Sequence, residues 1–364
     1  MAQIDELLHK MTTEGASDLH LKVGVRPRYR IDGDLIEDGD TGALAWEDLE
    51  RLTTEILSPE QERHYAETRE LDFAYGNPNI GRFRCNYFQD WWGPAAVFRR
   101  IPSQVPTLKQ LGLPEELATF AHLHRGLVLV TGSSGSGKTS TLAALIDVIN
   151  ENYRKHIITL EDPIEYLHEP KKAIIHQRGM HYDIVDFETG IVDSTRQDPD
   201  VLLIGELRDL PSIRQALVAA ELGTLVFATL HTNSASDSVD RIIDVFPHEE
   251  QPQVRTMLSQ CLAGVVCQVL VNRSESHGRL PAVEILKITP AVANLIREGK
   301  TQDIPNNIQS GRNYGMQTMD DALRDLMKQR HITPHEAWLH SRNKSNFERA
   351  AGRESAARLG LMPS

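Results

Sequence analysis

Residues 132–139 combine glycines, a lysine and a threonine in a spacing suited to binding a polyphosphate. They read Gly132-Ser133-Ser134-Gly135-Ser136-Gly137-Lys138-Thr139, which fits the pattern GxxxxGK followed by Ser or Thr in full. Glycines let backbone N–H groups turn inward around an anion, because no Cβ obstructs them. The alternative is a chance glycine-serine turn, which does not account for the elements expected on either side. We call residues 132–139 the phosphate loop.

The context of the phosphate loop predicts binding of ATP with Mg²⁺. An apolar strand is expected over 127–130 and an amphipathic helix over 139–150, the setting in which this motif works. The helix N-terminus adds a favourable partial positive charge. We expect Lys138 to reach the β- and γ-phosphates and the Thr139 hydroxyl to bind Mg²⁺. The residues expected to contact the nucleotide are Ser133, Ser134, Gly135, Ser136, Gly137, Lys138, Thr139 and Ser140.

Two further apolar strands are followed by acids, which hydrolysis requires in addition to binding. One carboxylate must orient or deprotonate water, and another must hold the metal shell. Residues 156–160 lead into Glu161-Asp162-Pro163-Ile164-Glu165, and residues 201–204 lead into Gly205 and Glu206. Ligands bind at the carboxyl ends of strands in open parallel sheets, so acids there suit a nucleotide site. The alternative for Glu206 is a strand that ends in a solvated turn.

A third strand, expected over 225–230, ends in His231-Thr232-Asn233. A polar cluster at this point suits sensing of the γ-phosphate, although a single histidine is more often a structural residue. Strands and helices alternate through this part of the chain, which predicts a mostly parallel sheet covered by helices. The helices expected here include 212–222 and a long amphipathic one over 253–271.

The first hundred residues differ in texture and predict a small α+β domain. The ATPase domain is expected over 115–342, after a linker at 103–114 that contains Pro106 and Gly112. Residues 343–364 are polar and rich in small residues, so we expect a flexible tail. The elements expected in the N-terminal domain, 1–102, are helices over 4–12 and 46–67 and strands over 18–23, 28–31, 82–88 and 95–99.

Composition excludes several other classes of protein. The formal net charge is -12 and the pI is about 5.7, whereas a generic nucleic-acid binder is usually basic. The three cysteines, Cys85, Cys261 and Cys267, form no CxxC pair, so neither a zinc ribbon nor a disulfide framework is indicated. No apolar run approaches the ~18 residues needed to cross a bilayer. We therefore expect a cytoplasmic protein without a transmembrane segment and without a nucleic-acid partner.

Together these segments resemble the secretion and pilus motor ATPases, and among them the type IV pilus retraction ATPases of the PilT family. The resemblance covers nearly the whole chain, from residue 17 to residue 318. It implies an α/β protein with a PAS-like N-terminal domain followed by a RecA-like ATPase domain. It also implies a homohexameric ring with ATP at the clefts. The motifs that carry it are GSSGSGKT at 132–139, EDPIEY at 161–166, RQDPD at 196–200, GELRD at 205–209 and TLHTNSA at 229–235.

The resemblance also implies roles for individual residues. Glu165, the second glutamate of EDPIEY, corresponds to the carboxylate that activates water. Glu206 corresponds to the Walker B residue that acts on Mg²⁺ through water, and His231 to a histidine of the family's His box. Arg84 and Arg99 occupy the strands whose arginines serve the nucleotide in such motors. The alternative for both arginines is that they are ordinary solvated strand residues.

The function implied is an ATP-hydrolysing motor for type IV pilus retraction and twitching motility. Such a motor would lie at the inner membrane through a platform protein, and a paralogous pilus ATPase is a further candidate partner. Several departures from the family's pattern bear on this reading, and Thr224 and Ala293 are two of them. Thr224 stands where the His box usually begins with histidine, and Ala293 replaces the first arginine of the segment AIRNLIRE.

Three alternatives remain at this stage. The first is a regulatory paralogue that binds nucleotide without turnover, which Thr224 and Ala293 favour. The second is a pilus-assembly or type II secretion ATPase, although those carry a tetracysteine zinc element. The third is a nucleic-acid translocase, since RecA-like cores serve that role too.

Overall fold

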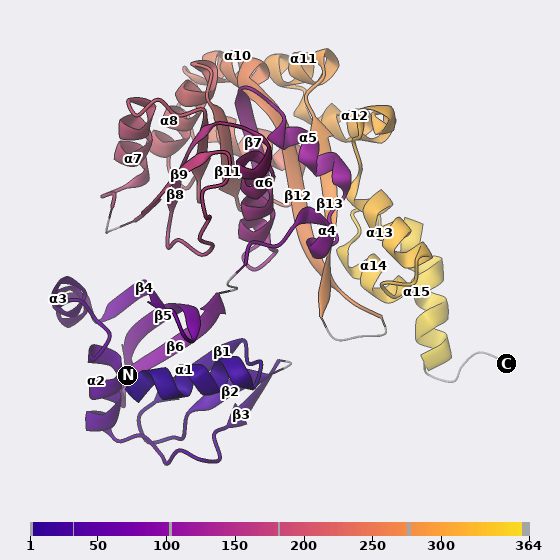
Figure 1. Cartoon of the computed structure of the whole chain (residues 1–364). Helices are drawn as coiled ribbons and strands as arrows, with labels where there is room; N and C mark the ends of the chain where they lie inside the picture. The colour runs from indigo at the N-terminus through magenta and orange to yellow at the C-terminus, as the bar shows by residue number, and fades with distance from the viewer. Residues whose placement is uncertain (1–2, 32, 102–103, 181–182, 275–277, 359–364) are drawn as a thin grey trace. The chain divides into compact units, whose positions relative to one another are not determined.

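The computed structural model of the protein describes residues 3–31, 33–101, 104–180, 183–274 and 278–358. The chain forms two compact units, shown in Figure 1. The first comprises Met1–Gln104 and Pro163–Leu167, and the second comprises Val105–Asp162 and His168–Ser364. The short segment 163–167 thus belongs to the first unit although both of its neighbours along the chain belong to the second.

Over its described residues the first unit contains a six-stranded antiparallel sheet and three helices. Strand β5 shows why the sheet has one covered face: Phe83, Cys85 and Tyr87 are buried, and the residues between them are not. The strand order is β3-β2-β1-β6-β5-β4. The strands are β1 (Asp18–Lys22), β2 (Arg28–Ile31), β3 (Asp34–Glu37), β4 (Glu70–Asn77), β5 (Gly81–Asp90) and β6 (Gly93–Ile101). The helices are α1 (Gln3–Thr13), α2 (Trp46–Thr54) and α3 (Pro59–Thr68).

The single helix predicted over 46–67 is wrong, because the chain forms α2 and α3 there instead. Ser58 is extended and caps α3, its hydroxyl accepting a hydrogen bond from the Gln61 N–H at 3.2 Å. Pro59 follows at the first helical position, and a residue before proline disfavours the helical conformation. The pair Ser58-Pro59 therefore starts α3, after α2 has already ended at Thr54.

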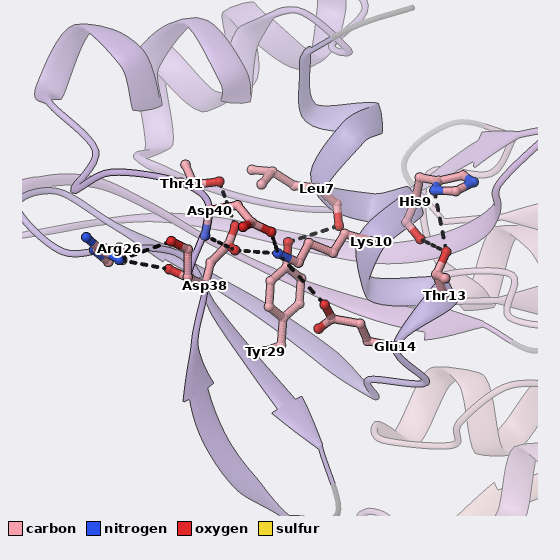
Figure 2. A network of polar contacts seen from close by, with 11 residues as sticks. Leu7, His9, Lys10, Thr13, Glu14, Arg26, Tyr29, Asp38, Asp40 and Thr41 are labelled. Atoms are coloured by element: carbon pink, nitrogen blue, oxygen red, sulfur yellow. Dashed lines mark hydrogen bonds and ion pairs between the residues drawn. The ribbon is translucent and has the colours of Figure 1, made fainter.

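Lys10 links helix α1 to the segment 38–41 through hydrogen bonds to two aspartates (Figure 2). The Lys10 Nζ donates to Asp38 Oδ1 at 2.6 Å and also to the Asp40 carboxylate. The Thr41 hydroxyl donates to the other Asp38 oxygen at 2.6 Å. The hydrogen bonds to Asp38 and Asp40 raise the pKa of Lys10 above its ordinary value, although desolvation opposes them. The helix is thereby anchored at its polar face as well as at its apolar face, where Leu8 is buried.

Within the described residues the second unit has a seven-stranded sheet in the order β13-β12-β7-β11-β10-β8-β9. All neighbours run parallel except β12 and β13, which pair antiparallel. The strands are β7 (Gly126–Thr131), β8 (His156–Glu161), β9 (Ile174–Gly179), β10 (Val201–Ile204), β11 (Leu225–Leu230), β12 (Leu262–Asn272) and β13 (Arg279–Lys287). The helices of the core are α4 (Leu108–Leu111), α5 (Ala118–Ala121), α6 (Lys138–Asn152), α7 (Phe187–Thr195), α8 (Leu210–Glu221), α9 (Ala235–Asp244), α10 (Gln251–Cys261), α11 (Pro290–Glu298) and α12 (Ile304–Ser310).

Both faces of this sheet are covered, as the alternation along β7 shows. Leu127 and Leu129 pack in a cluster with α7 to α12, whereas Val128 and Val130 pack in a second cluster with α4, α5 and α6. Strands buried on both faces are continuous apolar runs, which is why β7, β10 and β11 are recognisable in the sequence. Their bounds agree closely with the predicted strands.

The long helix predicted over 253–271 is wrong in its second half. Helix α10 ends at Cys261, and Leu262–Asn272 form β12 between β7 and β13. Periodicity alone does not separate a buried strand from a buried helix in a short apolar run. The valines of 265–271 favour a strand, and pairing with two neighbouring strands decides the matter. Cys261 and Cys267 therefore lie on different elements.

Within the segment 343–364, which we expect to be a flexible tail, residues 345–358 form the helix α15 (Ser345–Arg358). Phe347 is buried against α13 (Met319–Lys328) and α14 (Pro334–His340), which gives this polar helix an apolar anchor. Residues 359–364 lie outside the described residues. The segment expected as a linker contains α4. Across the described parts of the chain, no helix combines the length and apolar character needed to span a bilayer.

Candidate nucleotide site

The carboxyl ends of the central parallel strands meet at one edge of the sheet of the second unit. The backbone joins these ends directly. Gly132 N–H donates to Leu230 O at 3.3 Å, Leu207 N–H to Thr229 O at 3.0 Å, and Gly205 N–H to Leu160 O at 2.7 Å. The phosphate loop, the His231 segment and the Glu206 segment therefore lie beside one another, as the sequence predicts for a ligand site in such a sheet.

The phosphate loop is a tight turn between β7 and α6. Gly132 and Gly137 have φ values of 144° and 89°, in the region that favours glycine. Within the loop the Ser136 N–H donates to Ser133 O at 3.2 Å. Ser133, Ser134 and Gly135 are exposed at the tip, whereas Thr139 and Ser140 are half-buried in the first turn of α6.

Lys138, the first residue of α6, folds back over the phosphate loop. Its Nζ donates to Gly132 O at 2.8 Å and to Ser133 O at 3.0 Å, and the residue is only 9% exposed. Burial lowers the pKa of this lysine, and the charge of Glu206 partly offsets that effect. The loop thus holds an enclosed ammonium group beside its own backbone, an arrangement suited to a polyanion.

Glu206 lies between a histidine and an arginine. Its Oε1 is 3.1 Å from His231 Nε2, and its Oε2 is 2.8 Å from Arg208 Nη2. Burial favours the neutral acid, but the hydrogen bonds and charges of Arg208 and His231 outweigh it and lower the pKa of Glu206. The carboxylate is therefore ionised at neutral pH and oriented at both oxygens, as needed to accept from metal-bound water. The sequence reasoning singled out no role for Arg208, although it lies in the motif GELRD.

The first acid after β8 is Glu161, which is 9% exposed. Its Oε1 accepts from the Thr159 hydroxyl at 2.7 Å and from Gln177 Nε2 at 3.2 Å. These bonds hold Glu161 against β8 and β9. Of the acids after β8, Glu165 lies four residues further on and belongs to the other unit.

Within the first unit, Glu165 lies beside two arginines of β5. Its Oε1 is 3.8 Å from Arg84 Nη1, and its backbone oxygen accepts from Arg82 Nη1 at 3.3 Å. Arg82 also donates to Ile164 O at 3.3 Å. Arg84 in turn donates to Asp72 from Nη2 at 2.6 Å. Arg82 and Asp72 were missed by the sequence reasoning, because nothing local in the sequence joins them to residue 165.

The two predicted arginines lie opposite each other on adjacent strands of the first unit. Arg84 on β5 and Arg99 on β6 are paired in register. The Arg99 Nε donates to Asp18 Oδ1 at 2.7 Å. The structure therefore groups the predicted residues in two sets, each within its own unit: Lys138, Glu206 and His231 in one, and Arg84, Arg99 and Glu165 in the other.

Comparison with known proteins bears on the whole chain. A family model described as Type II/IV secretion system protein matches residues 1–359. The type IV pilus retraction ATPase PilT of Pseudomonas aeruginosa is 44% identical over 344 residues, covering 94% of this chain and 99% of that protein. A twitching motility protein of Neisseria gonorrhoeae is 44% identical over 321 residues, covering 88% of this chain and 86% of that protein.

A solved structure of the pilus retraction motor PilT with bound ADP has a TM-score of 0.88 and 40% identity to this chain. The matched region covers 96% of this chain and 99% of the chain in that structure. The predicted resemblance and the predicted α/β fold are thereby confirmed. The likeness also supports nucleotide binding.

Proposed function

This chain belongs to the Type II/IV secretion system protein family, and on that premise we propose that it is a motor that hydrolyses ATP to power type IV pilus retraction. It is an ATPase, and twitching motility is the cellular process it serves. The observation that carries the proposal is the meeting of an enclosed Lys138 and an ionised, doubly held Glu206 at one sheet edge.

The phosphate loop is the binding site for the phosphates of ATP. Its backbone N–H groups and the Lys138 ammonium neutralise the polyanion, and the start of α6 adds its partial positive charge. The residues proposed to contact the nucleotide are Ser133 to Ser140. Binding here leaves the γ-phosphate toward the ends of β10 and β11, where Glu206 and His231 lie.

The donor set at this edge fits Mg²⁺. Among the described residues, no cluster of three or more His, Cys, Asp and Glu could hold a metal by itself. Mg²⁺ is usually held by one or two carboxylates, water and the phosphates of its substrate, so such a cluster is not required. Thr139 supplies a hydroxyl and Glu206 a carboxylate that acts through water. When bound, the ion polarises the phosphoryl oxygens.

Hydrolysis needs a base for the attacking water and positive charge for the transferring phosphoryl group. Glu165 is the proposed base, because it matches the second glutamate of EDPIEY. Arg84 and Arg99 are the proposed cations. His231 holds one oxygen of Glu206 at 3.1 Å and so orients the carboxylate toward the metal-bound water.

The assembly we propose is a homohexameric ring of subunits with a PAS-like N-terminal domain and a RecA-like ATPase domain. Ligand-linked movement of the two domains would deliver force, since rigid-body motion is the common way in which a bound nucleotide drives a motor. The recipient is a pilus platform protein at the inner membrane, with the ring on the cytoplasmic side. A paralogous pilus ATPase is a further candidate partner.

The departures from the family pattern at Thr224 and Ala293 lie away from the Glu206 carboxylate. Thr224 precedes β11 and His231 follows it, so they are at opposite ends of a six-residue strand, about 20 Å long. Ala293 lies on α11, which packs against α10 and α12. Neither substitution removes a partner of Glu206, which favours the hydrolysing motor over a regulatory paralogue without turnover.

The test is Mg-ATPase activity and fluorescent-ADP binding, measured on the unaltered protein and on Lys138→Ala. Loss of both in Lys138→Ala is expected, whereas Lys172→Ala, a change at an exposed lysine outside the loop, should leave both unchanged. Activity should rise with protein concentration as the mass of the assembly rises. A stable monomer with constant specific activity would refute the ring, and equal ADP binding by Lys138→Ala would refute the phosphate site.

Function in the cell is tested separately. The gene should restore twitching to a strain without its own retraction ATPase, and the Lys138→Ala variant should not. A protein that has no ATPase alone but accelerates a paralogous pilus ATPase would instead be the regulatory subunit.

A further inference from the structure

A buried glutamine on β12 adjoins the phosphate loop, although 132 residues separate it from Ser136 in the sequence. Strand β12 runs parallel to β7, with Cys267 paired to Thr131. Gln268 therefore comes level with the first residue of the phosphate loop. Gln268 itself is only 2% exposed. A buried amide needs partners for its polar atoms, so its bonds show what it holds.

The two ends of this amide bind two different elements. The Gln268 Nε2 donates to Ser136 O in the phosphate loop at 2.7 Å. The Gln268 Oε1 accepts from the Thr141 hydroxyl of α6, also at 2.7 Å. The opposite orientation of the amide would set Oε1 against the Ser136 carbonyl, two acceptors facing each other, so the partners fix this orientation. One side chain thus joins the strand, the loop and the helix.

Gln268 also packs closely against two glycines of the phosphate loop. A Cβ on Gly132 would come within 2.3 Å of the Gln268 carbonyl oxygen. A Cβ on Gly137 would come within 2.8 Å of the Gln268 Nε2. The first and last glycines of the motif are therefore needed to admit this residue as well as for their backbone angles.

The bond to Ser136 O has a consequence for the next N–H group. In a trans peptide the C=O and the following N–H point in opposite directions. Because Gln268 holds the Ser136 carbonyl, the Gly137 N–H of the same peptide is directed away from β12. Backbone N–H groups of such loops are the donors that cradle phosphates. We propose that Gln268 is a positioning residue, which fixes the Ser136–Gly137 peptide for phosphate binding; the inference rests on the proposed role of the phosphate loop.

The variant that tests this is Gln268→Met, which keeps the length of the side chain and removes both hydrogen bonds. Fixed donors bind better than donors that must first be ordered, so the loss should appear in nucleotide affinity. We expect the affinity for fluorescent ADP to fall about tenfold, the cost typical of a lost buried hydrogen bond. The KM for ATP should rise by a similar factor, with a smaller change in kcat.

The matched control is Val283→Ala. Val283 is the register partner of Gln268 on β13, is 1% exposed and contacts the same core, but it makes no bond to the loop through its side chain. It should lower the melting temperature while leaving the ADP affinity within about twofold. Equal loss of ADP affinity in Val283→Ala and Gln268→Met would mean a merely structural role and would overturn the proposal. So would ADP binding by Gln268→Met within about twofold of the unaltered protein.

Thr141→Val provides the second reading if Gln268→Met does not fold. It removes the hydroxyl that donates to Gln268 Oε1 and that also lies 3.2 Å from Gly137 O, so Gln268 keeps its bond to Ser136 but loses the restraint on Oε1. ADP affinity should fall about threefold, a part of the full effect; an unchanged affinity would overturn the proposal. Failure of the phosphate site itself is distinguishable, because then Lys138→Ala would bind ADP as well as the unaltered protein does.

Discussion

Arg84 and Arg99 are paired in register on two antiparallel strands, yet each guanidinium binds an acid on a different neighbouring strand. Arg84 meets Asp72 of β4, and Arg99 meets Asp18 of β1. Like charges opposite one another destabilise a sheet, and these acids offset that cost. The pair thereby presents two ordered cations on one face of the first unit. The proposed role of both arginines at the nucleotide requires their guanidinium groups to be held in place, and the bonds to Asp72 and Asp18 do this.

The first prediction concerns Arg84. Replacing it with alanine should lower kcat for ATP at least tenfold, because a cation that stabilises the transferring phosphoryl group is lost. Steady-state ATPase assays measure this. Arg63→Ala is the control: it removes an exposed arginine of α3 outside the proposed site, so kcat should stay within about twofold. An unchanged kcat in Arg84→Ala would contradict the proposed role of Arg84 in hydrolysis.

Glu206→Gln is the second prediction. The substitution preserves shape and removes the charge that holds metal-bound water, so kcat should fall about a hundredfold or more. ADP affinity should change little, since the phosphate loop is intact. Turnover assays and fluorescent-ADP titration separate the two effects. The exposed Glu221→Gln, at the other end of the sheet, should change neither quantity. Unimpaired turnover in Glu206→Gln would remove this glutamate from the mechanism.

The third prediction concerns the thiols. Cys261 and Cys267 are buried, and desolvation raises their pKa values to about 12 and about 11. Burial also raises the pKa of Cys85 well above its ordinary value. The thiolate is the reactive form, and its fraction grows only as pH approaches the raised pKa. At pH 8 the native protein should react slowly with Ellman's reagent and the denatured protein rapidly, at all three cysteines. Rapid release of colour from native protein would contradict the burial.

Phe347 gives the fourth prediction. The side chain is 1% exposed and packs with the cluster that contains Leu323 and Ala337. Phe347→Ala should lower the free energy of unfolding by about 3 kcal/mol, because a large aromatic leaves a cavity. Chemical denaturation measures it, with Arg349→Ala, a change at an exposed position of the same helix, as the control. No effect of Phe347→Ala would support a tail that does not pack.

The centre of the candidate site could be predicted because its signals are local. A run of apolar residues, then glycines, then a lysine at a helix start predicts β7, the phosphate loop and α6 without knowledge of the rest of the chain. The same holds for the strand before Glu206. In each case the strand is buried on both faces, so composition alone marks it.

What the sequence could not predict depends on distant pairing. The valines near Cys267 fit a helix or a strand equally well by spacing, and only the neighbouring strands β7 and β13 settle which forms. The role of Gln268 follows from that register and was therefore missed. Asp18 and Asp72, the acids that bind the predicted arginines, are set by register in the same way. The helix α15 was missed because a single buried aromatic, Phe347, outweighs a polar composition.

The path of the chain through the segment 163–167 has a topological consequence. The backbone leaves the second unit after Asp162, contributes Glu165 to the first, and re-enters the second at His168. The backbone therefore passes between the two units at three points along the chain and not at one. A protease cut near residue 104 would leave the C-terminal fragment still carrying a stretch of the first unit. Deletion of residues 1–104 would likewise remove Arg84 and Arg82, the two arginines that contact Glu165.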